Sequence, residues 1–158
     1  DRFTKGDFVK QDTSKTADTT VYRTSKGKIV WGGGGIRPDI FVPLDTTEDF
    51  EYVYQLRSYI PEFIYKKYSA NPLILDGYKD LQFFGKSFRI SAEMQQEFLE
   101  YAQKQGFKYN EERYAKVTPK VMDYLKAYLA KQKWQGDGFY FILNQDDKVM
   151  EKALETFL

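Results

Sequence analysis

The chain has 158 residues and a formal net charge of +1, with basic and acidic residues interspersed along it. This balance argues against the strongly basic surface that nucleic acids and anionic membranes attract. The chain has no cysteine and no histidine, which excludes disulfides, cysteine nucleophiles, the Ser-His-Asp triad and every metal site built on these residues. No apolar run approaches the roughly 20 residues of a membrane helix. We therefore expect no cofactor, no metal, no nucleic-acid partner and no membrane span.

The first part of the chain combines a polar start with short β-prone runs. Residues 1–20 are polar and predict a loop. Residues 21–24 predict a strand and residues 29–31 its return strand, because residues 25–28 between them are typical of a turn. Residues 40–42 (Ile-Phe-Val) predict a further strand. The strands of this region therefore form at most a small sheet, which is marginally stable alone.

Beyond residue 45, apolar residues recur at helical spacing and predict a series of amphipathic helices. Residues 139–143 also predict a helix. Residues that cap or break helices set the expected boundaries. The expected starts are Thr46 or Thr47, Pro61, Asp76, Ser91, Asn110, Thr118-Pro119 and Asp146 or Asp147, and the expected stops are Asn71-Pro72, Gly106 and residues 136–138.

Two of the predicted helices carry definite expectations about burial. The helix after Pro119 has the strongest amphipathic pattern in the chain. The last helix is expected to turn its apolar side chains inward. The apolar face of the first consists of Val121, Met122, Leu125, Tyr128 and Leu129, and that of the second of Val149, Met150, Ala153, Leu154 and Phe157.

Together these patterns predict an α+β fold that is predominantly α, with a short N-terminal β-hairpin followed by a multi-helix bundle. The shift from β-prone to helical patterning places a domain boundary after residue 45. We therefore expect a β-rich part over residues 1–45 and a helical domain over residues 46–158.

Residues 27–43 form a glycine-rich segment between two β-prone runs. Consecutive glycines are costly in backbone entropy and are kept where the chain needs positive φ or a close approach. A phosphate-binding loop requires a helix directly after its glycines. Here Pro38 biases Arg37 away from helical geometry, and a β-prone run follows. A bend or bulge between strands explains the segment better than a nucleotide site.

The same segment resembles a known family. The pattern Gly27-Lys28-x-Val30-x-Gly32-x-Gly34-Gly35-Ile36-x-Pro38-Asp39-Ile40-x-Val42-Pro43 is similar to a segment of the C-terminal processing, or tail-specific, serine peptidases of bacteria. Position 28 is lysine where that family usually has arginine. The later runs 109–114 and 125–130 resemble the tails of the longer members. The residues that carry the motif are Gly32, Gly33, Gly34, Gly35, Ile36, Pro38 and Asp39.

The resemblance implies a parent enzyme that hydrolyses peptide bonds with a serine nucleophile and a lysine general base, usually with a PDZ module. Both catalytic residues would precede Asp1, so this chain would be an inactive C-terminal fragment. Its glycine segment would end the protease core, and its helices would act in scaffolding, dimerisation or substrate gating. The implied partners are the missing core, polypeptide substrates and a second copy. The implied location is the cell envelope or periplasm.

A different class of function stays open at this point. The helices can instead form a free-standing binding or adaptor domain, with the glycine segment a chance likeness. Tyrosines recur along the first two predicted helices, where some must face outward and can form a contact surface. Partly buried core tyrosines with their hydroxyls in water are the alternative. These residues are Tyr52, Tyr54, Tyr59, Tyr65 and Tyr68.

Other candidate chemistry in the sequence is better explained by structure. Gly85-Lys86-Ser87 matches the end of a P-loop, but Asp80 occupies the position of its first glycine. Neighbouring serines and lysines in turns do not make a catalytic dyad, which needs a buried lysine. Acidic pairs lie at helix starts, where capping and the helix dipole favour them. The serine–lysine candidates are Ser14 with Lys15 and Ser25 with Lys26 or Lys28, and Trp31 and Trp134 are expected in the core.

Overall fold

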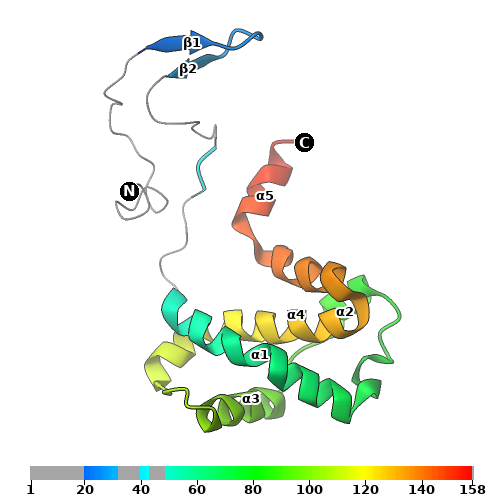
Figure 1. Cartoon of the computed structure of the whole chain (residues 1–158). Coiled ribbons are helices and arrows are strands. Elements are labelled where there is room, and N and C mark those ends of the chain that lie inside the picture. Colours follow the sequence, from blue (N-terminus) through cyan, green and yellow to red (C-terminus); the bar gives the residue numbers. More distant parts are fainter. Residues whose placement is uncertain (1–19, 32–39, 43–48, 158) are drawn as a thin grey trace. The chain divides into compact units, whose positions relative to one another are not determined.

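The computed structural model describes residues 20–31, 40–42 and 49–157 (Figure 1). The chain divides into two compact units, Asp1–Asp45 and Thr46–Leu158. The described part of the first unit contains a short β-hairpin, and that of the second is helical. The predicted α+β class, predominantly α with an N-terminal hairpin, is therefore confirmed.

The hairpin joins β1 (Val21–Arg23) to β2 (Ile29–Trp31) in antiparallel pairing, as the sequence predicts. Tyr22 lies opposite Val30 in the register. Gly27 adopts a φ of +81° in the turn, a conformation that glycine reaches without strain. The backbone N–H of Gly27 donates to the Thr24 carbonyl at 2.9 Å, which closes the turn.

The strand predicted over residues 40–42 is wrong. Ile40 lies in a bend, and the next two residues adopt no regular structure. A β-prone sequence becomes a strand only where a neighbouring strand pairs with its backbone. Among the described residues, β1 pairs only with β2 and neither pairs with residues 40–42.

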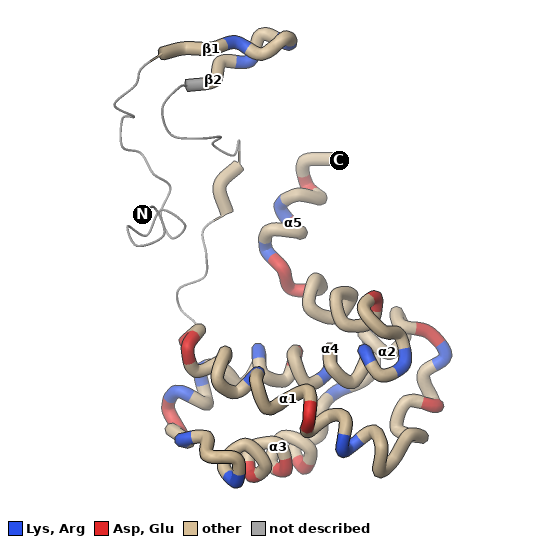
Figure 2. The backbone as a smooth tube through the Cα atoms, in the orientation of Figure 1, with Lys and Arg blue, Asp and Glu red and all other residues tan. Residues whose placement is uncertain are grey.

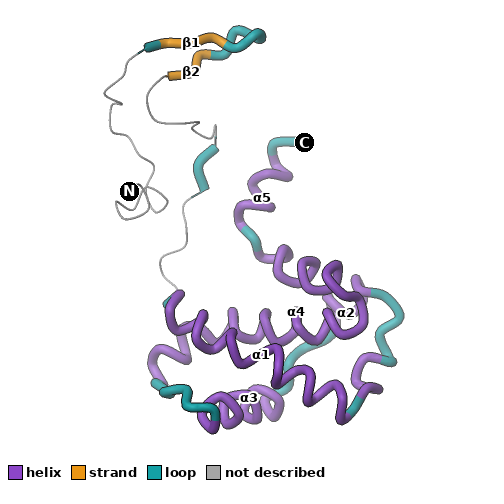
Figure 3. Tube along the Cα trace, in the orientation of Figure 1, coloured by secondary structure: helices purple, strands orange, loops and turns teal. Residues whose placement is uncertain are grey.

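The helical unit consists of α-helices with two short 3₁₀ segments between them (Figure 3). The longest two, α1 and α4, pack along each other, and α3 packs against α1 (Figure 1). Helix α2 packs against α4. The elements are α1 (Phe50–Ala70), η1 (Pro72–Leu75), α2 (Leu81–Ser87), α3 (Ala92–Lys104), α4 (Glu111–Leu143), η2 (Asn144–Asp146) and α5 (Lys148–Glu155).

The described hydrophobic core lies entirely within the helical unit, between Tyr52 and Ile142. Helix α4 contributes a stripe of buried side chains at i, i+4 spacing, as its amphipathic pattern predicts. Aromatic rings fill the space between the helices, for example Phe63 against Phe98 with centroids 5.3 Å apart. The fully buried members of the α4 stripe are Val117, Val121, Leu125 and Leu129.

Side-chain caps start the helices. Ser91 accepts from the backbone N–H of Met94 at 3.1 Å, and Asn110 from that of Arg113 at 2.9 Å. These two caps, and Asp147 at the start of α5, confirm the sequence prediction. Gly106, with a φ of +97°, follows the C-cap of α3 as predicted.

Two predicted caps are wrong. Asp49 caps α1, which begins at Phe50, so Thr46 and Thr47 do not cap it; both lie outside the described residues. Asp80 rather than Asp76 starts α2, because residues 72–75 form a separate 3₁₀ turn that Asp76 ends. Asn71-Pro72 ends α1, as predicted.

Both prolines expected to begin new helices lie inside longer ones. Pro61 lies within α1 and Pro119 within α4. A proline inside a helix removes one hydrogen bond, but the apolar stripe of each helix continues past it into the same core. Next to Pro119, the Thr118 hydroxyl donates to the Tyr114 carbonyl at 2.7 Å. Packing of the continuous apolar face therefore outweighs the local break signal.

The break predicted over residues 136–138 falls one residue earlier. Gln135 has φ 54° and ψ −139°, which kinks α4 there. The chain then resumes as helix, so the helix predicted over residues 139–143 is confirmed. Gly138 is buried after the kink, where an added Cβ would lie 2.8 Å from the Ala130 carbonyl oxygen.

The last helix does not bury its apolar face. Val149 is 59% exposed and Leu154 61% exposed, and no residue of α5 is buried. Its Asp147 cap and apolar pattern are as predicted, but the chain leaves the helix bundle after η2 (Figure 1). The prediction that Val149, Met150, Ala153, Leu154 and Phe157 point inward is therefore wrong.

Candidate functional site

The glycine motif singled out by the sequence lies outside the described residues. This holds for Gly32, Gly33, Gly34, Gly35, Ile36, Pro38 and Asp39. The structure describes the hairpin that precedes the motif and residues 40–42 that follow it.

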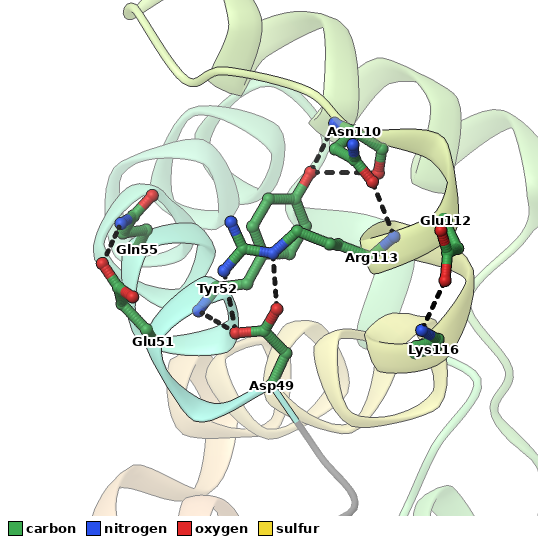
Figure 4. A network of polar contacts seen from close by, with 8 residues as sticks. All are labelled: Asp49, Glu51, Tyr52, Gln55, Asn110, Glu112, Arg113 and Lys116. Atoms are coloured by element: carbon green, nitrogen blue, oxygen red, sulfur yellow. Dashed lines mark hydrogen bonds and ion pairs between the residues drawn. The ribbon is translucent and has the colours of Figure 1, made fainter.

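Among the described residues, the most connected polar site joins the N-termini of α1 and α4 (Figure 4). The Arg113 guanidinium binds the Asp49 carboxylate through both Nε and Nη2, the latter at 2.9 Å. It also lies over the Tyr52 ring, 4.4 Å from the ring centroid. The Tyr52 hydroxyl accepts from the Asn110 backbone N–H at 2.8 Å and donates to the Asn110 carbonyl at 3.3 Å.

Two members of this network, Asp49 and Asn110, cap the starts of α1 and α4. Asp49 accepts from the Tyr52 N–H at 3.2 Å and Asn110 from the Arg113 N–H at 2.9 Å, so two caps are tied together by one arginine. The two-pronged arginine–carboxylate geometry fixes orientation as well as distance. The site therefore sets the angle at which α1 and α4 start.

The electrostatics of the pair follow from its hydrogen bonds. The Arg113 guanidinium holds the pKa of Asp49 below its ordinary value, and the hydrogen bond from the Tyr52 N–H lowers this pKa further. Burial has the opposite effect. The Asp49 carboxylate in turn raises the pKa of Arg113. The lowered pKa makes the Asp49 carboxylate a weak base, and the raised pKa makes the Arg113 guanidinium a weak acid, so both are poorly suited to proton transfer near neutral pH.

A second polar site lies where α2 meets α4. A cleft of about 290 Å³ is lined there by Arg89, Asp123, Lys126 and Asp146, among others. The Lys126 ammonium donates to the Gly85 carbonyl at 2.6 Å. Burial and the nearby Arg89 lower the pKa of Lys126, and the two carboxylates oppose that change.

This lysine joins α4 to α2. Its amine holds a carbonyl in the last turns of α2, where a cation is favourable. Gly85 permits the close approach of Phe141 and Gln145 to α2, because an added Cβ would lie 2.8 Å from each. Lys133 makes a similar contact, donating to the carbonyls of Leu75 at 3.1 Å and Tyr78 at 2.8 Å.

The structure also shows where the remaining sequence candidates lie. Gly85-Lys86-Ser87 lies inside α2, which excludes a P-loop. Trp134 packs beside Phe84, with ring centroids 5.3 Å apart, as the core expectation requires. Tyr52 is buried, whereas Tyr54 is 74% and Tyr65 64% exposed.

Sequence reasoning did not find Arg113, Lys126 or Lys133. Each binds a partner more than 40 residues away in the chain. The sequence around these three residues does not indicate such contacts, because basic residues recur at the same helical spacing on exposed helices. Only the packing of α1, α2 and α4 brings each cation to its acceptor.

Acidic and basic residues are both spread over the helical unit (Figure 2). The described residues contain no group of three or more aspartates and glutamates placed to hold a metal ion. Within the same residues, no helix combines the length and the apolar character needed to cross a membrane.

The fold and these sites define a small helical domain held by buried aromatic packing and long-range basic contacts. A family model matches residues 50–136, more than half of the chain, and the chain belongs to this family, described as a family of unknown function (DUF8443). The match begins at the first residue of α1 and ends one residue past the kink at Gln135. No curated protein and no solved structure matches the chain.

Proposed function

We propose that this chain is the non-catalytic C-terminal part of a tail-specific serine endopeptidase. The observation that carries the proposal is the Gly-Ile-x-Pro-Asp motif within residues 27–43, which resembles the end of that family's protease core. On this proposal the serine nucleophile and lysine base lie upstream of Asp1, and the parent acts on polypeptides in the cell envelope. The helical unit then serves the parent as a scaffold, a dimerisation element or a substrate gate.

The division of the chain into two units supports separate roles for a protease core and a helical part. The described core runs from Tyr52 to Ile142, within the helical unit. The hairpin leaves Val21 48%, Tyr22 58% and Ile29 46% exposed. A two-stranded hairpin with exposed apolar residues needs further strands or a helix to be stable, and a protease core would supply them.

One observation favours the second candidate, a free-standing helical binding domain. The family match, residues 50–136, lies within the helical unit and does not include the glycine motif. On that reading the domain works by its exposed aromatic side chains and needs no enzyme. The two candidates differ in what precedes Asp1 in the gene.

The test uses the intact parent chain and an unstructured polypeptide substrate, with cleavage followed by mass spectrometry. We expect cleavage by the parent, none by residues 1–158 alone, and none by a parent whose upstream serine is replaced by alanine. A parent that lacks an upstream serine–lysine pair, or that cleaves nothing, contradicts the peptidase proposal and favours the binding domain.

A further inference from the structure

Helix α1 carries an exposed stripe that the core does not use. Phe50 is 45% exposed, Tyr54 74% and Tyr65 64%, and Pro61 is exposed between them. At 100° per residue these four positions fall within an arc of about 60° and span roughly 22 Å of the helix. We call Phe50, Tyr54, Pro61 and Tyr65 the α1 stripe. Aromatic residues of this kind are enriched in protein interfaces.

The spacing of the α1 stripe is the same in both directions. The intervals between its residues are four, seven and four, centred between Arg57 and Ser58. If two copies of α1 pack antiparallel about that centre, Phe50 faces Tyr65 of the second copy and Tyr54 faces its Pro61. A two-fold interface requires this self-complementarity, because the same patch serves both subunits.

The charges beside the stripe are compatible with this pairing. Glu51 and Lys66 lie on one side of the α1 stripe near its opposite ends. In the antiparallel arrangement the ion pair of Lys66 and Glu62, 2.7 Å apart, comes near Glu51 of the other copy. Lys66 also lies over the ring of Tyr101 on α3, 5.1 Å from its centroid, and so stays bound within its own copy. Arg57, near the centre, is turned toward its own Tyr124, 4.9 Å from the ring centroid.

We propose that the α1 stripe is a homodimer interface in which two copies of this chain pair antiparallel through α1. The area fits a reversible dimer. At about 200 Å² per fully buried aromatic residue, Phe50, Tyr54 and Tyr65, which are 45%, 74% and 64% exposed, offer about 370 Å². This is roughly half of the ~800 Å² that each side of a standard interface buries. Pro61, Ser58 and the flanking polar residues supply the rest. This proposal does not rest on the peptidase assignment.

A second exposed apolar face, on α5, does not fit this role. Its eight residues extend only about 12 Å. That length is too short to supply a standard interface by itself.

Cross-linking tests the geometry directly, because the native chain has no cysteine. Ser58 is exposed beside the two-fold centre, so we expect Ser58→Cys to form a disulfide-linked dimer under mild copper-phenanthroline oxidation. The control is Ser69→Cys, exposed on the same helix but about 34 Å from its counterpart in the antiparallel pair. We expect Ser58→Cys to cross-link at least ten times faster.

Equal cross-linking of both variants indicates a parallel pair and overturns the proposed register. Cross-linking of neither overturns the interface itself. The full 158-residue chain is used throughout, with circular dichroism to show that each variant is folded.

The oligomeric state provides the independent measurement. Sedimentation equilibrium should show a mass that rises from 18.6 kDa toward twice that value with concentration. Tyr54→Lys should weaken the association at least tenfold, whereas Tyr140→Lys, at a similarly exposed position on α4, should leave it unchanged. A chain that stays monomeric at all concentrations, or equal effects of both lysines, overturns the proposal and assigns the stripe to a different partner.

Discussion

Helices α4 and α5 both carry an apolar face, yet only α4 covers it. Leu125 and Leu129 of α4 are fully buried, whereas Leu154 of α5 is 61% exposed. The two patterns read alike in the sequence, because periodicity shows which face of a helix is apolar and not what covers that face. Burial depends on the route of the chain, and after η2 the chain no longer follows the bundle. The following predictions test this contrast, beginning with the largest effect.

Truncating one leucine in each helix measures the contrast itself. Leu125→Ala removes a fully buried side chain and should lower the free energy of unfolding by about 2–5 kcal/mol. Leu154→Ala should change it by less than about 0.5 kcal/mol, because the side chain is already in water. Urea unfolding of both variants is the measurement. Equal losses would show that the α5 face is covered in solution.

The kink that ends the straight part of α4 depends on a close approach at Gly138. Gly138→Ala places a Cβ 2.8 Å from the Ala130 carbonyl oxygen and 2.9 Å from Trp134 Cβ, and should destabilise by about 1–3 kcal/mol. Gly136→Ala is the matched control, since its Cβ meets nothing within 4 Å. Thermal melts should separate the two. A harmless Gly138→Ala would mean that the helix after the kink packs less tightly.

The backbone conformation of Gln135 provides a second test of the kink in α4. Its φ of 54° with ψ of −139° is a conformation that glycine adopts far more readily than glutamine. Gln135→Gly should therefore stabilise the chain by about 1 kcal/mol, despite the usual cost of glycine in a helix. Chemical denaturation measures this, with Gln132→Gly in the regular part of α4 as a control that should destabilise.

The smallest effect concerns Asp49, which binds Arg113 near the start of α4. Because the pKa of Asp49 is lowered in the folded chain, its contribution is present above the ordinary aspartate pKa and is lost as the pH falls through the folded value. The stability of the native chain should therefore decline at acidic pH more than that of Asp49→Asn, which has no charge to lose at this site. Parallel slopes of stability against pH would contradict this role.

Local signals predicted much of the fold and none of its long-range polar contacts. Ser91, Asn110 and Gly106 mark helix ends because their side chain, or the lack of one, acts within a few residues. Pro61 and Pro119 misled because a proline is also tolerated inside a helix whose apolar face continues into a core. Arg113 and Lys126 bind acceptors that only tertiary packing brings near them.

Part of the candidate interface could be predicted from the sequence. Tyr54 and Tyr65 stand out among the recurring tyrosines, but their exposure depends on where α4 covers α1. The symmetry of the α1 stripe also becomes visible only when Pro61 lies inside one continuous helix. The misplaced break at Pro61 therefore concealed the pattern.

The contact at Gly85 has a consequence for relatives of this chain. Gly85 lies inside the family match, but Phe141 and Gln145, which press against it, lie beyond its end. The two sides are therefore expected to evolve together: a homologue with a larger residue at position 85 should carry a smaller one at position 141. Such paired changes, seen in an alignment of family members that extends past residue 136, would indicate that the inherited unit is longer than the matched segment.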